Sequence, residues 1–300
     1  MGVWGKWVKH AKYIYNIQDF NPEQTMAIGY SKNKLIMHLM MGLDKFSCRK
    51  SDLIITVGRD LAQTIDKRFK NKRTPKTIFI NNWIDEKAIY PLEKGNEEVE
   101  KFKKSYNLQN KFIFMYSGNI GLYYDLENIF KVIEKIKPGT KASDNREVVF
   151  VFIGEGTVLE KIKKYKKEKN MDNVIFIPYQ DKKELIYSLN SADVHWCVNA
   201  KGIKGVSCPS KYYGIAAVGK PILGVLEENT EVRLLIEETK GGLVSTSGDY
   251  DSLKEDIDWF INNADNKELK DMGKRSREYL ESNLTKDISI NKYKEEILNL

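Results

Sequence analysis

The chain has 300 residues, of which 41% are hydrophobic and 30% are charged, a composition typical of a globular protein with a sizeable core. Its net charge of +7 comes from 49 Lys and Arg against 42 Asp and Glu, which favours anionic or phosphate-bearing partners without requiring nucleic acid. Three irregularly spaced cysteines exclude a disulfide framework or a zinc site, and neither a signal peptide nor an apolar run near 18 residues is found, so we expect a cytoplasmic protein.

Basic residues are interleaved with tryptophan at the start of the chain. Residues 1–12 predict a short amphipathic helix in which Lys6, Lys9 and Lys12 lie among Trp4 and Trp7. Such a surface can dock peripherally on an anionic membrane, and a merely solvated helix face is the alternative. A second basic group comprises Lys67, Arg68, Lys70, Lys72 and Arg73.

The first part of the chain alternates strands and helices. Residues 13–17 predict a strand that ends in a polar turn, where Asp19 either faces a ligand or caps the next segment. Strands at 51–57 and 76–80, with a helix at 58–70 between them, predict a parallel sheet. A helix at 32–49 has an apolar stripe that we expect to face the core, formed by Leu35, Ile36, Leu39, Met40, Leu43 and Phe46.

A plausible linker at 90–95, which contains Pro91 and Gly95, precedes a second and longer series. It begins with a charged helix at 97–106, and its six lysines between residues 161 and 169 indicate a solvated helix face rather than a nucleic-acid track. The predicted strands lie at 112–116, 148–153, 174–177, 194–198, 221–225 and 242–244, and the last helices at 250–263, 266–283 and 286–300. This is an α/β layout with three strands followed by six.

Small and polar turns follow the strands of the second series, and we expect them at one rim of its sheet. The turn at 117–121 opens onto a helix, where bare backbone N–H groups can hold a phosphate. Asn229 or Thr230 would cap a helix at 231–238, and Lys211 could help to hold a diphosphate without magnesium, unless it is only an exposed residue at a helix start. His10, His38 and His195 are expected to be structural, and no Ser-His-Asp or metal-binding pattern is present.

Seven segments taken together resemble glycosyltransferase family 4, and most closely its fucosaminyl-transferase-like branch, which builds bacterial O-antigen and capsular polysaccharides. The match extends over nearly the whole chain, and the order of the segments is more specific than any one of them. They are SDLIITVG at 51–58, INNWID at 80–85, YSGNIG at 116–121, FIGEG at 152–156, VIFIPY at 174–179, PSKYYG at 209–214 and GKPI at 219–222.

The resemblance implies a GT-B architecture, in which two Rossmann-like domains with parallel sheets face a cleft. Residues 1–91 would form the acceptor-side domain, residues 92–285 the nucleotide-sugar domain, and residues 286–300 a helix that returns to the first domain. Family members have further strands and helices at the start of the first domain. We therefore expect the first domain of this chain to be truncated, which exposes apolar edges unless something covers them. The alternatives are that the chain is a fragment, that it pairs with another polypeptide, or that it is inactive alone.

The resemblance also implies roles for particular residues. Asp19 stands at a strand end where many relatives have a cleft-facing His-Asp or similar pair, and it is a catalytic candidate together with Lys211. The candidates for donor binding are Gly118, Asn119, Gly121 and Lys211 at the diphosphate, Gly154 and Glu155 in the second glycine turn, Tyr179 at the nucleobase, and Asn229, Thr230 and Glu231 at phosphate or ribose.

Two departures from the family pattern bear on these roles. Asn119 and Tyr124 stand where many members have Arg and Lys, so binding of the diphosphate would depend more on Lys211. Val206 and Gly214 stand where many members have two glutamates, so this chain lacks that route to the ribose.

The leading hypothesis is a retaining, metal-independent glycosyltransferase that moves a sugar from a UDP-type donor to a lipid-linked saccharide at the inner face of the membrane. No cofactor and no metal is expected, because fixed N–H dipoles and Lys211 would neutralise the leaving diphosphate. The alternative is a non-catalytic or split-enzyme subunit that binds a nucleotide-sugar and a partner chain. A nucleotide-sugar epimerase of the same architecture lacks supporting acids and histidine in the sequence.

Overall fold

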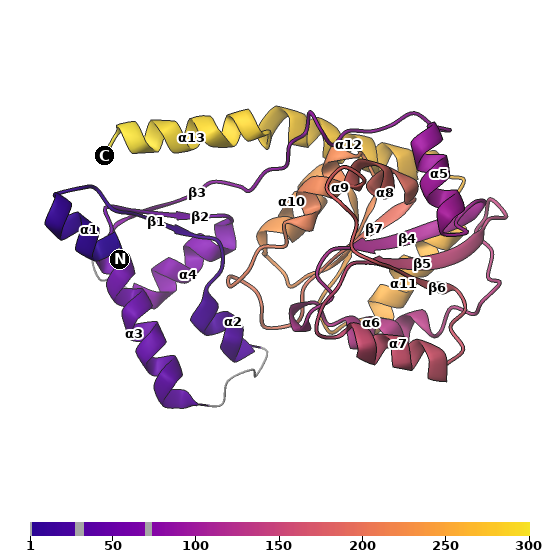
Figure 1. The fold of residues 1–300 in the computed structure, drawn as a ribbon, viewed down its shortest axis with the longest axis horizontal. Helices are drawn as coiled ribbons and strands as arrows, with labels where there is room; N and C mark the ends of the chain where they lie inside the picture. Colours follow the sequence, from indigo (N-terminus) through magenta and orange to yellow (C-terminus); the bar gives the residue numbers. More distant parts are fainter. Residues whose placement is uncertain (1, 28–32, 70–73) are drawn as a thin grey trace.

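The computed structural model describes residues 2–27, 33–69 and 74–300, so Lys70, Lys72 and Arg73 of the second basic group lie outside the described residues. The chain forms a first lobe, from α1 to β3, and a second lobe, from α5 to α12 (Figure 1). The elements of the first lobe are α1 (Gly2–Lys9), β1 (Ile14–Ile17), α2 (Asn21–Ala27), α3 (Lys34–Lys50), β2 (Leu53–Thr56), α4 (Arg59–Phe69) and β3 (Lys76–Phe79).

The first lobe is built on a parallel sheet of order β1-β2-β3, as the alternation of strands and helices predicts. Ile54 packs with Leu61 and Ile65 of α4 on one face of the sheet. On the other face, Leu53 and Ile55 pack with side chains of the last helix, α13 (Lys286–Leu298). Figure 1 shows this helix running back from the second lobe across the three strands.

The predicted core-facing stripe of α3 is wrong. The six apolar side chains that define it are between 39% and 79% exposed, and the buried residues of this helix are instead Met37 and Cys48. Helical periodicity shows that apolar residues share a face, but it does not show what covers that face. Side chains of α1 are exposed as well, and together they form what we call the α1/α3 apolar surface, made up of Trp4, Trp7, Val8, Leu35, Ile36, Leu39, Leu43 and Phe46.

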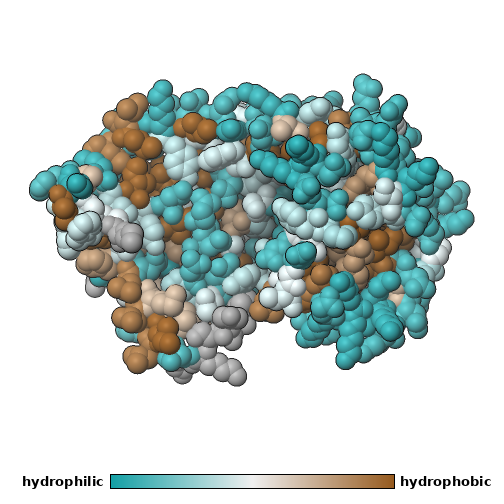
Figure 2. Space-filling model, viewed as in Figure 1, coloured by the Kyte–Doolittle hydropathy of each residue, from teal (hydrophilic) through white to brown (hydrophobic). Residues whose placement is uncertain are grey.

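The α1/α3 apolar surface also carries basic groups. The Trp7 and Phe46 rings meet edge to face with their centres 6.5 Å apart, and Lys50 Nζ lies 5.8 Å and 5.9 Å from these two ring centres. In Figure 2, hydrophobic residues are gathered over the part of the first lobe where α1 and α3 lie. No helix in the described ranges has the length and apolarity needed to cross a bilayer.

The second lobe is a doubly wound parallel sheet of order β6-β5-β4-β7-β8-β9. Helices α6, α7 and α11 cover one face, and α5, α8, α9, α10 and α12 cover the other. The strands are β4 (Lys111–Ser117), β5 (Glu147–Ile153), β6 (Val174–Ile177), β7 (Val194–Val198), β8 (Ile222–Val225) and β9 (Gly242–Ser245).

The six strands agree with the sequence prediction to within one or two residues at each end, because their continuous apolar runs are those of a sheet buried on both faces. Between β4 and α6 a short 3-10 turn, η1 (Leu122–Tyr124), is inserted. The helices are α5 (Glu97–Ser105), α6 (Leu126–Ile133), α7 (Leu159–Glu168), α8 (Leu185–Ser191), α9 (Lys211–Ala217), α10 (Glu231–Thr239), α11 (Tyr250–Asn262) and α12 (Lys267–Asn283). The domain limits at residues 91 and 285 fall between elements and stay a prediction.

Candidate functional site

Two glycine turns interlock at the carboxyl ends of β4 and β5. Gly118 and Gly154 have φ angles of +137° and +133°, which side chains of L-residues rarely allow. The Gly118 N–H donates to the Ile153 carbonyl at 2.9 Å, and a Cβ on Gly154 would lie 2.1 Å from the Gly118 oxygen. Gly154 therefore supports the first turn through backbone packing.

The next residues of the two turns are joined in the same way. The Ile120 N–H donates to the Glu155 carbonyl at 2.7 Å, while the side chains of Glu155 and Asn119 are exposed. A Cβ on Gly156 would lie 2.3 Å from the Ile120 oxygen, and one on Gly121 would lie 3.2 Å from the Asn119 amide. These contacts place the predicted residues of both turns in one cluster and add Gly156, which the sequence analysis did not select.

Lys211, the first residue of α9, lies directly over the first turn. A Cβ on Gly118 would be 2.8 Å from Lys211 Cε and 3.5 Å from its Nζ, so only glycine leaves room for this side chain. The ammonium is 3.8 Å from the ring centre of Tyr124 and 4.8 Å from that of Tyr116, which is favourable for a cation. In the described part of the chain, Lys211 Nζ has no hydrogen-bond acceptor and no acid partner.

Burial without an acid partner lowers the pKa of Lys211 to about 8. The aromatic rings attract the ammonium but do not replace the hydrogen bonds that water would give it. An entering phosphate would supply both a counter-charge and acceptor oxygens. The site therefore holds a cation that is ready for an anionic ligand.

Asp19 reaches the same region from the first lobe. The Phe20 N–H donates to the Val206 carbonyl at 2.9 Å, and Asp19 pairs with Ser207 in an isolated antiparallel bridge. Burial raises the pKa of Tyr124, and the nearby charge of Asp19 raises it further, so the carboxylate lies close to the ring that covers Lys211. The two predicted catalytic residues thus both lie near Tyr124.

The start of α10 differs from the prediction. Thr230 makes no side-chain cap, because its hydroxyl donates to the Glu227 carbonyl at 2.9 Å. Asn229 is exposed, with a φ of +59°. Instead, Asp60 of the first lobe accepts from the Glu231 N–H at 3.3 Å and from the Gly205 N–H at 2.9 Å. Thr230 therefore stands at the predicted N-cap position without a side-chain bond to the helix, and the N-terminus of α10 is held by the first lobe and does not stand free at the rim.

Glu231 is buried and its carboxylate joins the two lobes. It accepts from the Arg59 backbone N–H at 2.9 Å, from Arg59 Nε at 2.8 Å and from Asn81 Nδ2 at 2.8 Å. Both carboxylate oxygens are therefore used by the protein, and the expected contact with phosphate or ribose has no free acceptor in this arrangement. Sequence reasoning missed Arg59, Asp60 and Asn81 as partners, although all three follow strands that end at the cleft.

Tyr179 follows β6, the outer strand of the sheet, and its side chain is 70% exposed. Its side chain does not pack against the other candidate residues that the structure describes. Its role at a nucleobase stays a prediction. A cavity of about 150 Å³ adjoins Lys211 and includes Ser117, Ser210 and Gly214 in its wall. Gly214 is buried in this wall, and a Cβ there would lie 3.5 Å from Ile84 Cδ1 and 3.5 Å from Leu189 Cδ1, so apolar side chains close the wall at this position.

The predicted histidine roles agree with the structure for His195, which is buried in β7. Its Nε2 lies 2.9 Å from the Leu189 carbonyl, and burial lowers its pKa to about 4. Among the described residues, no three His, Cys, Asp or Glu side chains are grouped as a metal site would require. Metal independence stays a prediction.

Together, the two parallel α/β lobes and the rim of glycine turns define a two-lobed enzyme of the Rossmann-like class. The chain belongs to the family of glycosyl transferases group 1, whose family profile matches residues 98–279. It is therefore a transferase enzyme, and the predicted family is confirmed.

Two curated proteins are similar to nearly the whole chain or to most of it. "Probable glycosyltransferase WbjE" of Pseudomonas aeruginosa is 27% identical over 283 residues, which are 94% of this chain and 67% of WbjE. WcaI of Escherichia coli strain K12, named as a colanic acid biosynthesis glycosyl transferase, is 24% identical over 77% of this chain and 55% of its own length. The chain thus spans between about half and two thirds of these relatives.

Solved structures confirm the predicted GT-B fold. Anabaena Alr3699/HepE in complex with UDP and glucose superposes with a TM-score of 0.80 at 11% identity, over 100% of this chain and 74% of that one. The sucrose-phosphate synthase of Thermosynechococcus elongatus superposes with a TM-score of 0.74 at 15% identity, over 99% of this chain and 72% of that one. At these identities the likeness concerns the fold.

Proposed function

We propose that the chain transfers a sugar from a nucleotide-sugar, most favourably a UDP-linked one, to a lipid-linked saccharide during synthesis of a cell-surface polysaccharide. The name of WcaI, for colanic acid biosynthesis, supports this assignment, as does the likeness to WaaG, which is described as a glycosyltransferase involved in lipopolysaccharide biosynthesis. The UDP complexes of the Anabaena protein favour the donor class. The fucosaminyl-transferase-like branch remains part of this proposal.

The observation that carries the proposal is the position of Lys211. Its ammonium lies over the Gly118 turn, on a partly buried side chain that has no acceptor from the described residues. A donor diphosphate on this turn would complete its hydrogen bonding. As the bond to the sugar breaks, negative charge grows on the departing diphosphate, and a fixed cation in a dry cleft stabilises that charge by roughly 3 kcal/mol.

The proposed reaction retains the anomeric configuration and needs no metal ion. Lys211 and the backbone N–H groups of the first glycine turn would neutralise the leaving nucleoside diphosphate. Asp19 extends from the lobe assigned to the acceptor, and its charge acts on Tyr124. It would orient the acceptor hydroxyl toward the anomeric carbon on the face from which the diphosphate leaves. The hydroxyl oxygen would form the new bond there as the bond to the diphosphate breaks, and its proton would pass to the departing diphosphate oxygen.

The test is calorimetric titration of the purified chain with UDP, GDP and ADP. UDP is expected to bind best, and Lys211→Ala should weaken it by ~1 to 3 kcal/mol, since a charged hydrogen-bond partner is lost. Lys164→Ala is the control for loss of a surface charge, because Lys164 lies on the solvent face of α7 with its side chain 78% exposed. Equal and feeble binding of all three nucleotides by every variant would contradict the donor site.

A second candidate is a split-enzyme or non-catalytic subunit that binds a nucleotide-sugar and requires a partner chain. The observation that favours it is strand β1, which pairs only with β2 in the described sheet and leaves its other edge open. Release of UDP from a UDP-sugar by the chain alone would favour the complete enzyme. UDP binding without any release, restored by a partner segment, would favour the subunit.

A further inference from the structure

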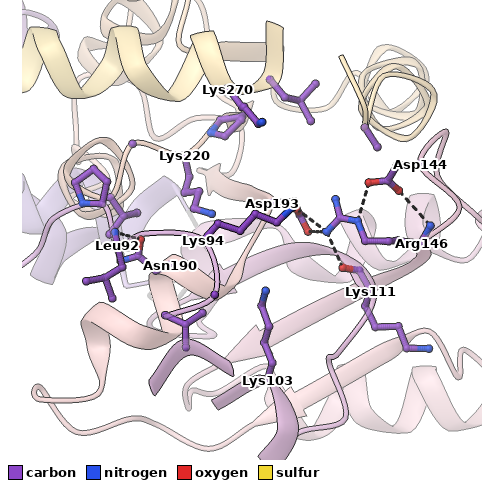
Figure 3. Close-up of a pocket in the computed structure, with 18 of the residues that line it drawn as sticks. Leu92, Lys94, Lys103, Lys111, Asp144, Arg146, Asn190, Asp193, Lys220 and Lys270 are labelled. Carbon is purple, nitrogen blue, oxygen red and sulfur yellow. Dashed lines mark hydrogen bonds and ion pairs between the residues drawn. The ribbon is translucent and has the colours of Figure 1, made fainter. Parts of the chain in front are cut away.

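A second and larger cavity, of about 670 Å³, lies where the strands of the second sheet begin, at the end opposite to the glycine turns (Figure 3). Its wall includes Lys111 at the start of β4, Asp193 just before β7 and Pro221 just before β8. The connecting segment 91–95 and helices α5 and α12 complete it. The glycine turns of the candidate donor site follow the strands, so the two sites are separated by the length of the sheet.

Six basic and five acidic residues line this cavity, and only some of the basic side chains are paired with an acid. Arg146 pairs with Asp144 at 2.7 Å and with Asp193 at 2.9 Å, and it donates to the Lys111 carbonyl at 3.0 Å. Lys103 has Glu100 at 3.4 Å. Within the described ranges, the cations of the wall that have no acid within 4.0 Å are Lys94, Lys220 and Lys270.

Lys220 has the least favourable position of these cations. Burial lowers its pKa, and the neighbouring charges of Lys103 and Arg146 lower it further, while Asp193 acts in the opposite direction. A buried ammonium without an acceptor destabilises the empty protein, and like charges beside it add to that cost. An anionic ligand would remove both costs at once.

Two of the unpaired cations, Lys94 and Lys220, and the loosely paired Lys103 come from separate elements but point to one place. In Figure 3 the amino groups of Lys94, Lys103 and Lys220 extend into the same interior space from the connecting segment, from α5 and from the loop before β8. A single carboxylate would satisfy only one of them, whereas linked phosphate groups carry charge over several ångströms. Lysine binds phosphate well because its ammonium is a point charge on a flexible chain. The volume of the cavity lies in the range of sites that bind small molecules.

We propose that this cavity is a binding site for an oligophosphate, held by Lys94, Lys103 and Lys220. Lys94 belongs to the segment that connects the two lobes, so a bound oligophosphate would also fasten that segment to the second lobe. The site is separate from the donor site and does not depend on the proposed transfer reaction.

Calorimetric titration of the full chain with inorganic tripolyphosphate tests the proposal. The titration is done on Lys211→Met, in which the donor-site cation is absent, so that binding at the second cavity is measured alone, and one ion is expected to bind to it. Lys220→Met and Lys103→Gln should each weaken binding at least tenfold. Lys164→Met, on the solvent face of α7, is the control for loss of a general surface charge.

Thermal unfolding gives a second readout that checks folding. Lys220→Met should melt at the same temperature as the wild type or higher, because it removes a buried charge, and tripolyphosphate should no longer raise its melting temperature. The proposal is overturned if Lys211→Met loses the tripolyphosphate while Lys220→Met keeps it, or if nothing binds. Citrate binding as tightly as tripolyphosphate would overturn the assignment to oligophosphates.

Discussion

At the scale of single residues, the site depends on one partly buried lysine. Its neighbours are Gly118, whose missing side chain makes room for it, and two tyrosine rings that attract its charge. The identity of Lys211 as a candidate could be predicted from the sequence because it follows a strand end in a recognisable motif. The roles of Tyr116 and Tyr124 could not, because ring contacts between separate turns leave no spacing in the sequence.

The lowered pKa of Lys211 predicts a pH-dependent stability difference. Its pKa is about 8 in the folded chain and 10.5 ordinarily, so the unfolded state binds more protons between these values. The desolvated ammonium therefore lowers the free energy of unfolding by its full amount below pH 8. This loss disappears as the pH rises from 8 to 10.5. Lys211→Met should unfold at higher denaturant concentration than wild type at pH 7, and the difference should shrink by pH 10.

Chemical denaturation of both proteins at pH 7, 8.5 and 10 provides the measurement. Exposed Lys164→Met is the control and should follow the wild type at every pH, since its ammonium is already in water. A constant difference between Lys211→Met and wild type across this range would show that the ammonium is not desolvated.

At the scale of elements, the strands were the most predictable part and the partners of helices the least. Both sheets follow from apolar runs bounded by turns. The stripe of α3 and the start of α10 were misjudged for one reason: what covers a helix face or a helix end comes from distant parts of the chain. Asp60, which accepts from the N–H of Glu231 at the start of α10, is 171 residues away from Glu231 in the sequence.

The contact of α10 with the first lobe predicts a loss of stability in Glu231→Gln. The substitution replaces a buried carboxylate that bonds to Arg59 and Asn81 with a neutral amide, and the expected cost is about 1 to 3 kcal/mol. Glu238→Gln is the matched control, because Glu238 binds the same arginine from a side chain that is 42% exposed. Its cost should stay below about 1 kcal/mol.

Urea unfolding followed by tryptophan fluorescence measures both variants. Equal costs for the two substitutions would mean that Glu231 does not hold the lobes together. Such a result would also support the predicted role of Glu231 in binding phosphate or ribose at the donor site.

At the scale of the whole molecule, the α1/α3 apolar surface and the donor turns lie on different parts of one chain. We propose that the surface binds anionic lipid, because aromatic side chains and Lys50 are combined on it and Lys9 and Lys12 are exposed beside it. A transferase with a lipid-linked acceptor gains from such an attachment, since donor and acceptor then meet at the membrane surface.

Vesicle sedimentation tests this attachment. The chain should bind phosphatidylglycerol vesicles more tightly than phosphatidylcholine vesicles, and added salt should weaken the binding. Replacing Trp4 and Trp7 together by Ser should lower the affinity about tenfold or more, by loss of buried apolar area. Leu298→Ser is the control, because this side chain is 74% exposed on α13, which covers the other face of the first sheet.

Equal binding to both kinds of vesicle would contradict the lipid assignment. A dimer in light scattering that the Trp4 and Trp7 substitutions dissociate would instead place a protein on this surface.

The path of α13 has a consequence for how the chain is made. Tyr293 and Leu300 cover Leu53, Ile55 and Ile80, so one face of the first sheet is completed by side chains translated more than 200 residues later. During synthesis on the ribosome, that face stays exposed to solvent until α13 emerges. This face of the first lobe can therefore be covered only after the second lobe has been translated.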